Sequence, residues 1–127
     1  MKINFILLFL VLLLASCKNS RISRLPELRL SSEVINLGTV KALDTIKKYF
    51  LVYNTGSDTL FIKKVGVSCG CTNGYSNKKF ILPNDSATIF FTYSPANDID
   101  SIQKSLIVEN NSIEPFKLVY IKAFVKR

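Results

Sequence analysis

Short apolar runs with a period of two are the feature that most constrains how this chain can fold. From residue 33 onward, segments rich in Val, Ile, Phe, Tyr and Thr alternate with polar residues and are split by Gly, Asn, Asp or Pro. Successive side chains of a strand point to opposite faces, so these runs predict half-buried strands rather than helices. We expect strands over 33–40, 45–54, 59–69, 80–82, 87–94, 102–109 and 116–125.

The third of these strands changes phase in its middle. Leu60 and Ile62 are apolar at even positions, whereas Val65 and Val67 are apolar at odd positions. One extra residue in one strand of a pair produces such a shift. The sequence therefore predicts a β-bulge or bend at Lys63-Lys64.

About seven short strands without intervening helices are typical of an antiparallel, immunoglobulin-like β-sandwich. The chain has no Trp, so the Cys-Trp-Cys core of antibody domains is absent. We predict an all-β sandwich over 33–127, preceded by a polar, basic tether over 17–32. The segment 73–79 is polar and rich in turn-forming residues, so we expect a loop there.

The first residues indicate export. Lys2 precedes an apolar run from Phe5 to Ala15, which is shorter than the roughly 20 apolar residues that cross a bilayer. The sequence Leu14-Ala15-Ser16-Cys17 resembles a bacterial lipobox. That resemblance implies a lipoprotein signal peptide over 1–16 and a lipid on Cys17; the alternative is an ordinary signal peptide with an accidental cysteine.

The formal charge is +8, or +7 once Lys2 leaves with the signal peptide. An exported chain meets no nucleic acid, so the anionic partner that we expect is the membrane surface. Basic residues lie beside the expected anchor: Lys18, Arg21, Arg24 and Arg29. They either hold the tether against the membrane or simply keep it solvated. No acidic run resembling a surface-export signal follows Cys17, which favours a location in the cell envelope facing the periplasm.

The complete absence of histidine excludes several functions. Ser-His and Cys-His nucleophilic pairs and histidine-containing zinc sites are impossible. The sequence also contains no phosphate-binding loop, EF-hand or carboxylate pair. We therefore expect no catalytic residue, no bound metal and no cofactor.

Cys69-Gly70-Cys71 is the one place where unusual chemistry is conceivable. The three interpretations are a pair of packed structural thiols, a local disulfide suited to an oxidising compartment, and a thiol site for Cu(I) or redox exchange. A metal usually needs further ligands, and the mature chain offers neither His nor Met. In an extended chain both thiols would share the inward parity of Val65 and Val67, which favours packing.

Four segments together resemble a bacterial family: Phe50-Leu51-Val52-Tyr53-Asn54-Thr55-Gly56, Leu60-Phe61-Ile62, Ser68-Cys69-Gly70-Cys71-Thr72 and Ile81-Leu82-Pro83-Asn84. They are similar to the domain-of-unknown-function 1573 family over roughly 33–125. The resemblance implies an immunoglobulin-like module related to the hydin and major sperm protein group, often found in lipoproteins. Asn84 stands where the family usually has Gly, and Asn is the next best residue for a left-handed turn.

A repeated tripeptide, Asp followed by a hydroxyl residue and an apolar residue, resembles the acceptor of a bacterial periplasmic O-glycosylation system. Its hydroxyl residues are Thr45, Thr59, Ser86 and Ser101. The same tripeptides also suit entry into a strand, because Asp favours turns and a hydroxyl residue before an aliphatic one favours strands. Both interpretations remain open.

Several aromatic residues are out of phase with the expected core, namely Tyr49, Tyr53 and Phe90. If the strands 45–54 and 87–94 are neighbours, these residues form an outer stripe that either binds a partner or stabilises the sheet by cross-strand pairing. We expect a lipid-anchored, non-catalytic binding or scaffolding module whose partner is an unknown envelope protein or glycan. The alternative is a periplasmic thiol protein that uses Cys69 and Cys71.

Overall fold

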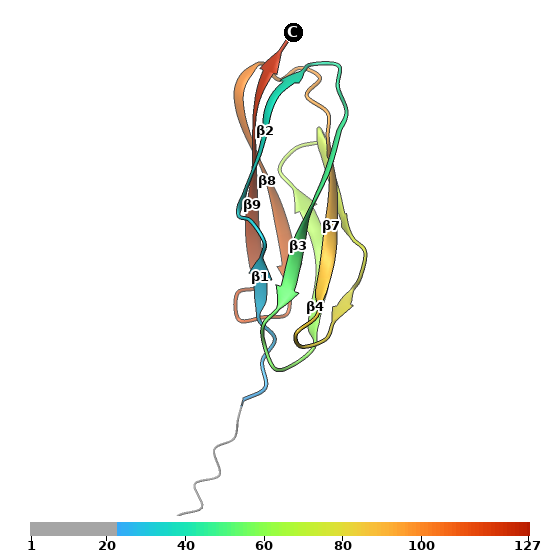
Figure 1. The fold of residues 1–127 in the computed structure, drawn as a ribbon, viewed down its shortest axis with the longest axis vertical. Coiled ribbons are helices and arrows are strands. Elements are labelled where there is room, and N and C mark those ends of the chain that lie inside the picture. The colour runs from blue at the N-terminus through green and yellow to red at the C-terminus, as the bar shows by residue number, and fades with distance from the viewer. Residues whose placement is uncertain (1–22) are drawn as a thin grey trace, which may run out of the picture.

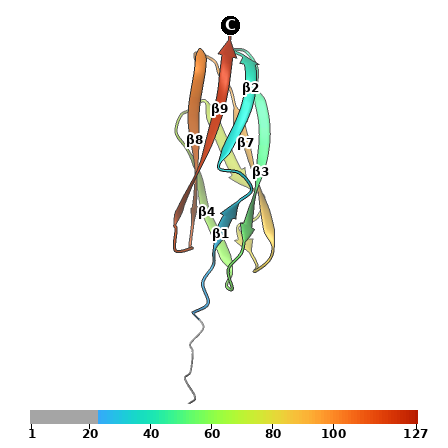
Figure 2. The same cartoon turned by 60° about the vertical axis from the view of Figure 1, so that its left-hand side comes forward.

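The computed structural model describes residues 23–127, so Cys17 and the expected signal peptide lie outside the described residues. Nine strands follow one another: β1 (Leu28–Leu30), β2 (Val34–Lys41), β3 (Ile46–Asn54), β4 (Leu60–Val67), β5 (Thr72–Ser76), β6 (Phe80–Ile81), β7 (Ser86–Tyr93), β8 (Asp100–Asn110) and β9 (Phe116–Lys126). They form an elongated sandwich (Figures 1 and 2). Between residues 23 and 127 there is no helix that could span a membrane.

The two sheets have the strand orders β1-β3-β7-β5 and β2-β9-β8-β4-β6. This confirms the predicted immunoglobulin-like sandwich. Every pair is antiparallel except β2 with β9, which is parallel. The exception arises because the chain changes sheets after β1: β1 pairs with β3, and β2 continues in the same general direction beside β9.

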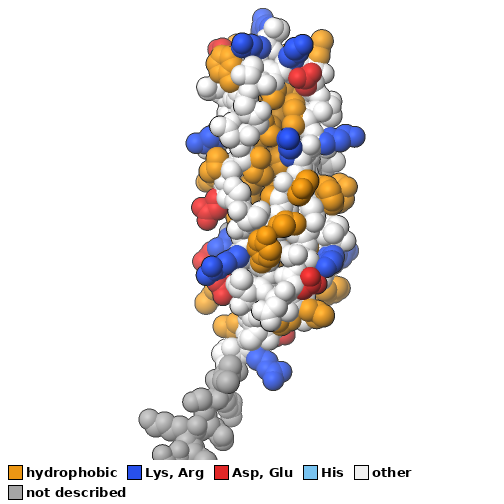
Figure 3. Space-filling model, viewed as in Figure 1, with side chains coloured by type: hydrophobic (Ala, Val, Ile, Leu, Met, Phe, Trp, Pro, Cys, Tyr) orange, Lys and Arg blue, Asp and Glu red, His pale blue; other side chains and the backbone are white. Residues whose placement is uncertain are grey.

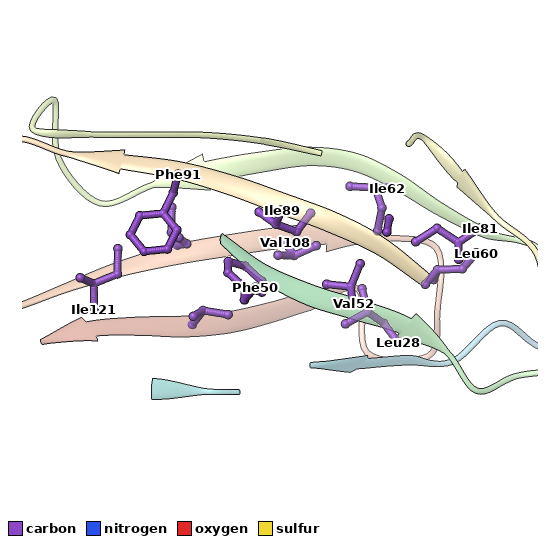
Figure 4. Close-up of a cluster of buried hydrophobic side chains, with 13 residues drawn as sticks. Leu28, Phe50, Val52, Leu60, Ile62, Ile81, Ile89, Phe91, Val108 and Ile121 are labelled. Atoms are coloured by element: carbon purple, nitrogen blue, oxygen red, sulfur yellow. The ribbon is translucent and has the colours of Figure 1, made fainter. Parts of the chain in front are cut away.

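The alternation seen in the sequence produces the core between the sheets. Phe50 and Val52 of β3 are buried as expected, and they face Val108 and Ile121 of the other sheet (Figure 4). The register between β4 and β8 shifts between Ile62 and Lys64. The predicted bulge at Lys63-Lys64 is thus confirmed.

Strand β1 lies within the segment that we expected to be tether. Leu28 is buried in the main core cluster, and Leu28–Leu30 pairs with Asn54–Val52 of β3. Three residues carry too little alternation to identify a strand, since periodicity needs a longer run. The folded domain therefore begins before residue 33.

The expected loop over 73–79 is wrong for its first half, because β5 (Thr72–Ser76) pairs with β7. Asn, Gly and Ser have low strand propensity, and here pairing with a neighbouring strand overrides it. Gly74 is required by the close approach of the two sheets: a Cβ at this position would lie 2.8 Å from Val65 Cγ1.

The turn after β3 fixes the segment through which the chain enters the domain. The buried Asn54 side chain donates to the carbonyls of Asp58 (2.7 Å) and Ile81 (2.8 Å). Its Oδ1 accepts from the backbone N–H groups of Gly56 (3.0 Å) and Glu27 (3.4 Å). These bonds give a physical reason for the Asn-Thr-Gly sequence.

Two backbone positions in this region depend on residue type. A Cβ on Gly56 would lie 2.3 Å from the Leu25 carbonyl oxygen, so only glycine allows the entering segment to pack there. Asn84 has a φ of 64°, which confirms the expected left-handed turn.

Candidate functional site

A row of three aromatic side chains crosses the outer face of the four-stranded sheet. Tyr49 of β3 lies opposite Phe90 of β7, which lies opposite Tyr75 of β5. The ring centroids of Tyr49 and Phe90 are 6.2 Å apart, and those of Phe90 and Tyr75 are 5.4 Å apart. Tyr49 and Tyr75 remain 64% and 62% exposed and Phe90 37% exposed. We call these three residues the aromatic row.

The neighbouring positions of the same face are mostly polar. On one side of the row, Lys47, Thr92 and Asn73 lie opposite one another. On the other side, Leu51 lies opposite Thr88. The face therefore combines exposed aromatic rings with hydroxyl, amide and ammonium groups. The strands β3, β5 and β7 contain no carboxylate.

The structure brings together two of the three aromatic residues that the sequence indicated. Tyr49 and Phe90 are direct cross-strand neighbours, as expected if their strands pair. Tyr53 lies opposite Ser86, outside the row. Tyr75 was missed because its segment was expected to be a loop. The signal was the alternation around it, since Asn73, Tyr75 and Asn77 occupy every second position, as outward residues of a strand do.

The edge of β3 is less suited to binding than this face. β1 pairs with β3 only from Val52 to Asn54, so the first half of β3 is an open edge. Lysines occupy that half at 47 and 48, and Lys48 has the inward parity of Phe50 yet is exposed. Charged residues at such positions prevent another chain from adding a strand.

Cys69 and Cys71 form a disulfide, with their Cα atoms 5.2 Å apart. The two cysteines are not separate packed thiols on one extended strand, because β4 ends at Val67 and residues 68–71 form a turn that brings the two sulfurs together. This turn carries the chain from the five-stranded sheet to the four-stranded sheet. Of the three interpretations, the structure contains the local disulfide.

The turn over residues 68–71, which we call the corner, is hydrogen-bonded to neighbouring strands on both sides. The Ser68 N–H donates to the Ser105 carbonyl (3.0 Å), and the Ser105 N–H donates to Ser68 Oγ (2.9 Å). The Ser94 N–H donates to the Cys71 carbonyl (2.9 Å). Cys71 also packs against a second core cluster that contains Tyr93. The corner is thus a structural junction of the two sheets.

A charged cluster lies beside the second core cluster. The buried Tyr93 hydroxyl donates to Asp98 Oδ2 (2.7 Å), and Lys104 Nζ donates to Asp98 Oδ1 (2.9 Å). Burial and the contact with Asp98 raise the pKa of Tyr93 above its usual range. Partial burial opposes ionisation of Asp98, but the hydrogen bonds from Lys104 and Tyr93 outweigh it and lower the pKa of this carboxyl.

The sequence interpretation missed this cluster because it treated the acidic residues as single turn residues. The signal was Lys104, which shares the inward parity of Ile102 and Leu106. In this cluster the charges of Asp98 and Lys104 are paired with each other. At the corner, the two sulfurs are joined in a disulfide. In the described part of the chain, no three His, Cys, Asp or Glu side chains come together as metal ligands would.

The four candidate glycosylation residues all lie at or near the start of a strand. The Thr59 and Ser86 N–H groups each donate a hydrogen bond to Oδ1 of the preceding Asp, at 2.7 Å in both cases. Thr45 and Ser101 are exposed, whereas Thr59 and Ser86 are half-buried. Two of the tripeptides therefore stabilise entry into a strand through the Asp side chain, and Thr45 and Ser101 are the more accessible hydroxyls.

Two packed sheets joined by a strand-switching N-terminal segment define the class of this domain, an immunoglobulin-like β-sandwich. A family model, Protein of unknown function (DUF1573), matches residues 28–125, and the chain belongs to this family. This confirms the resemblance drawn from the sequence. No curated protein matches the chain.

Solved structures confirm the fold. A protein of unknown function from Porphyromonas gingivalis W83 is similar with a TM-score of 0.71 and 19% identity, over 78% of this chain and 46% of that one. A PapD-like (ASH) domain of human CEP192 has a TM-score of 0.62 and 8% identity, over 81% and 87%. The VesB protease of Vibrio cholerae has a TM-score of 0.59 and 13% identity, over 80% and 32%. The chain thus spans less than half of the P. gingivalis protein.

Proposed function

We propose that this chain is a non-catalytic binding module of the bacterial cell envelope, held on the periplasmic side by a lipid on Cys17, and that it binds its partner through the aromatic row. The observation that carries the proposal is the row itself. Tyr49 and Tyr75 project from a face whose opposite side is the core, and both keep most of their surface exposed.

The size of the row supports a specific contact. If each residue offers about 200 Å² of side-chain surface, the exposed fractions leave about 300 Å² accessible. Patches of about this size on monomers are often functional. The row alone is well below the roughly 800 Å² per partner of a stable protein interface. Its partner is therefore either small or also contacts the flanking Thr and Asn side chains.

The remaining polar groups support a role without catalysis. A nucleophile needs a free, activated side chain, whereas the Cys69 and Cys71 sulfurs are bonded to each other. Asp98 holds both Lys104 and Tyr93 in place. The immunoglobulin-like class of the domain agrees with this role.

Crosslinking and capture of the native, membrane-associated chain from envelope fractions tests the proposal. We expect that the unmodified chain captures a partner and that the double variant, Tyr49→Ser with Tyr75→Ser, does not. Phe124→Ser is the matched control, because Phe124 is an exposed aromatic residue of the other sheet. Equal capture by the double variant and the unmodified chain would remove the aromatic row from the proposal.

A further inference from the structure

The loops of one end of the sandwich gather around the segment through which the chain enters. The Ser57 N–H donates to the Leu25 carbonyl (2.9 Å), and the Asn84 N–H donates to the Asn54 carbonyl (3.0 Å). The turn between β8 and β9 joins the same end, because Asn111 Oδ1 accepts from the Phe61 N–H (2.7 Å). We call this the entry end; it is the lower end in Figures 1 and 2.

Large apolar side chains are exposed on the loops of the entry end. Ile113, in the turn between β8 and β9, is 81% exposed, and Leu82, after β6, is 62% exposed. Leu25, Phe80 and Phe116 are also exposed there. Hydrophobic side chains are visible on both flanks of this end in Figure 3. Five large apolar side chains are thus exposed at this end, against Leu43 and Ile99 on the loops of the opposite end, and loop tips normally carry polar residues.

The length of the chain before the domain limits where this end can be. Cys17 and Leu25 are eight residues apart in the sequence, so at most about 29 Å separates them, whatever conformation the segment adopts. The sandwich itself is longer, since the eleven residues of β9 span about 36 Å. A lipid on Cys17 would therefore hold Leu25, and with it the entry end, within about 29 Å of the membrane, whereas the far end can lie farther away than this.

The charges of the entry end permit contact with an anionic surface. Three of its carboxylates are paired with basic side chains: Glu27 with Arg29, Asp85 with Lys78, and Glu114 with Lys117. A further carboxylate, Asp58, is exposed and its Oδ1 accepts from the Thr59 N–H. Arg24 and Lys79 are exposed beside them. Basic side chains near an anionic leaflet are attracted to it, and the paired carboxylates limit the opposing repulsion.

We propose that the entry end lies on the lipid surface and inserts Ile113 and Leu82 into the headgroup region, so that the domain itself contacts the membrane. This inference rests on the lipid anchor of the proposed function. The contact orients the sandwich with its long axis away from the membrane and leaves the aromatic row accessible. Apolar side chains at the boundary between headgroups and acyl chains are stabilised there by burial of their surface.

Single tryptophans test this contact, because the sequence has no Trp of its own. The variants are Ile113→Trp, Leu82→Trp and, as a matched control, Leu43→Trp. Leu43 is 98% exposed and lies between β2 and β3, at the opposite end from Asn54. Each full-length, processed chain is reconstituted into phosphatidylethanolamine–phosphatidylglycerol vesicles with and without brominated acyl chains. Co-flotation with the vesicles is measured alongside the fluorescence.

We expect brominated lipid to quench the tryptophans at 113 and 82 strongly and the tryptophan at 43 hardly at all. If the chains co-float but positions 113 and 43 are quenched equally, the membrane contact of the entry end is overturned while the anchor stands. If the chains do not co-float, the anchor fails and the contact fails with it.

Discussion

Replacing Asn54 by Ala tests how the domain holds its entering segment. Asn54 is 1% exposed, and its amide group makes four hydrogen bonds, to groups of Glu27, Gly56, Asp58 and Ile81. Alanine removes all four bonds and leaves the buried Ile81 carbonyl and three part-buried backbone groups without this partner. We expect the variant to fold but to lose much of the stability of this end.

The magnitude follows from the bonds. A hydrogen bond contributes about 0.5–1.5 kcal/mol net, and an unsatisfied buried group costs about 1–3 kcal/mol. Because the four bonds share one side chain and the region relaxes, their losses do not add fully. We expect the free energy of unfolding to fall by roughly 3 kcal/mol, which lowers the melting temperature by about 12–20 °C in a domain of this size.

Urea and thermal denaturation of the full chain measure this change. The matched control is Asn73→Ala, because Asn73 is exposed on the outer face of β5; surface substitutions of this kind change stability by about 0.5 kcal/mol or less. Hydrogen exchange at Thr55 and Ser57, whose N–H groups donate to Glu27 and Leu25, should rise selectively in Asn54→Ala. A loss of stability no greater than that of Asn73→Ala would refute the role of Asn54.

Three further outcomes are expected. Denatured but unreduced protein should offer no reactive thiol at the Cys69–Cys71 disulfide, and its reduction should cost only about 1.5 kcal/mol because the closed loop is so short; two reactive thiols would contradict the disulfide. Since the fold lowers the pKa of Asp98, its contribution is present above the unfolded pKa of about 3.9 and is lost as pH falls through the lower folded value. The unfolding free energy of Asp98→Asn should therefore fall less steeply below about pH 4 than that of the unmodified chain, and parallel acid limbs would argue against the charged cluster. Finally, if the native host glycosylates the chain, intact mass should show hexose-sized additions that disappear with Thr45→Val or Ser101→Val; a native mass without additions would leave the tripeptides with strand entry alone.

The parts of the fold that were predictable are those in which one strand carries enough alternation by itself. The run from Ala87 to Tyr93 has four inward apolar residues at every second position, and the phase change at Lys63-Lys64 marks a bulge. β1 and β5 could not be recognised in this way. Their identity comes from pairing with β3 and β7, which is a property of the assembled sheet.

The residues of the candidate site were likewise predictable only where one strand alternates by itself. Tyr49 and Phe90 were identified from parity, whereas Tyr75 joined them only through the pairing of β5 with β7. The parity of Cys69 and Cys71 was misleading because it assumes an extended chain, and the chain turns there to change sheets. Periodicity predicts the direction of a side chain only while the strand continues.

Photocrosslinking from single positions of the native chain in its own envelope tests the central claim most directly. A photoreactive residue at Tyr75 reports what touches the aromatic row, and one at Phe124 reports the outer face of the other sheet. The proposed function predicts a discrete crosslinked product from position 75 that is absent from position 124 and is lost when Tyr49→Ser is added. Identical crosslinking from both positions, or none from position 75, would contradict binding through the aromatic row.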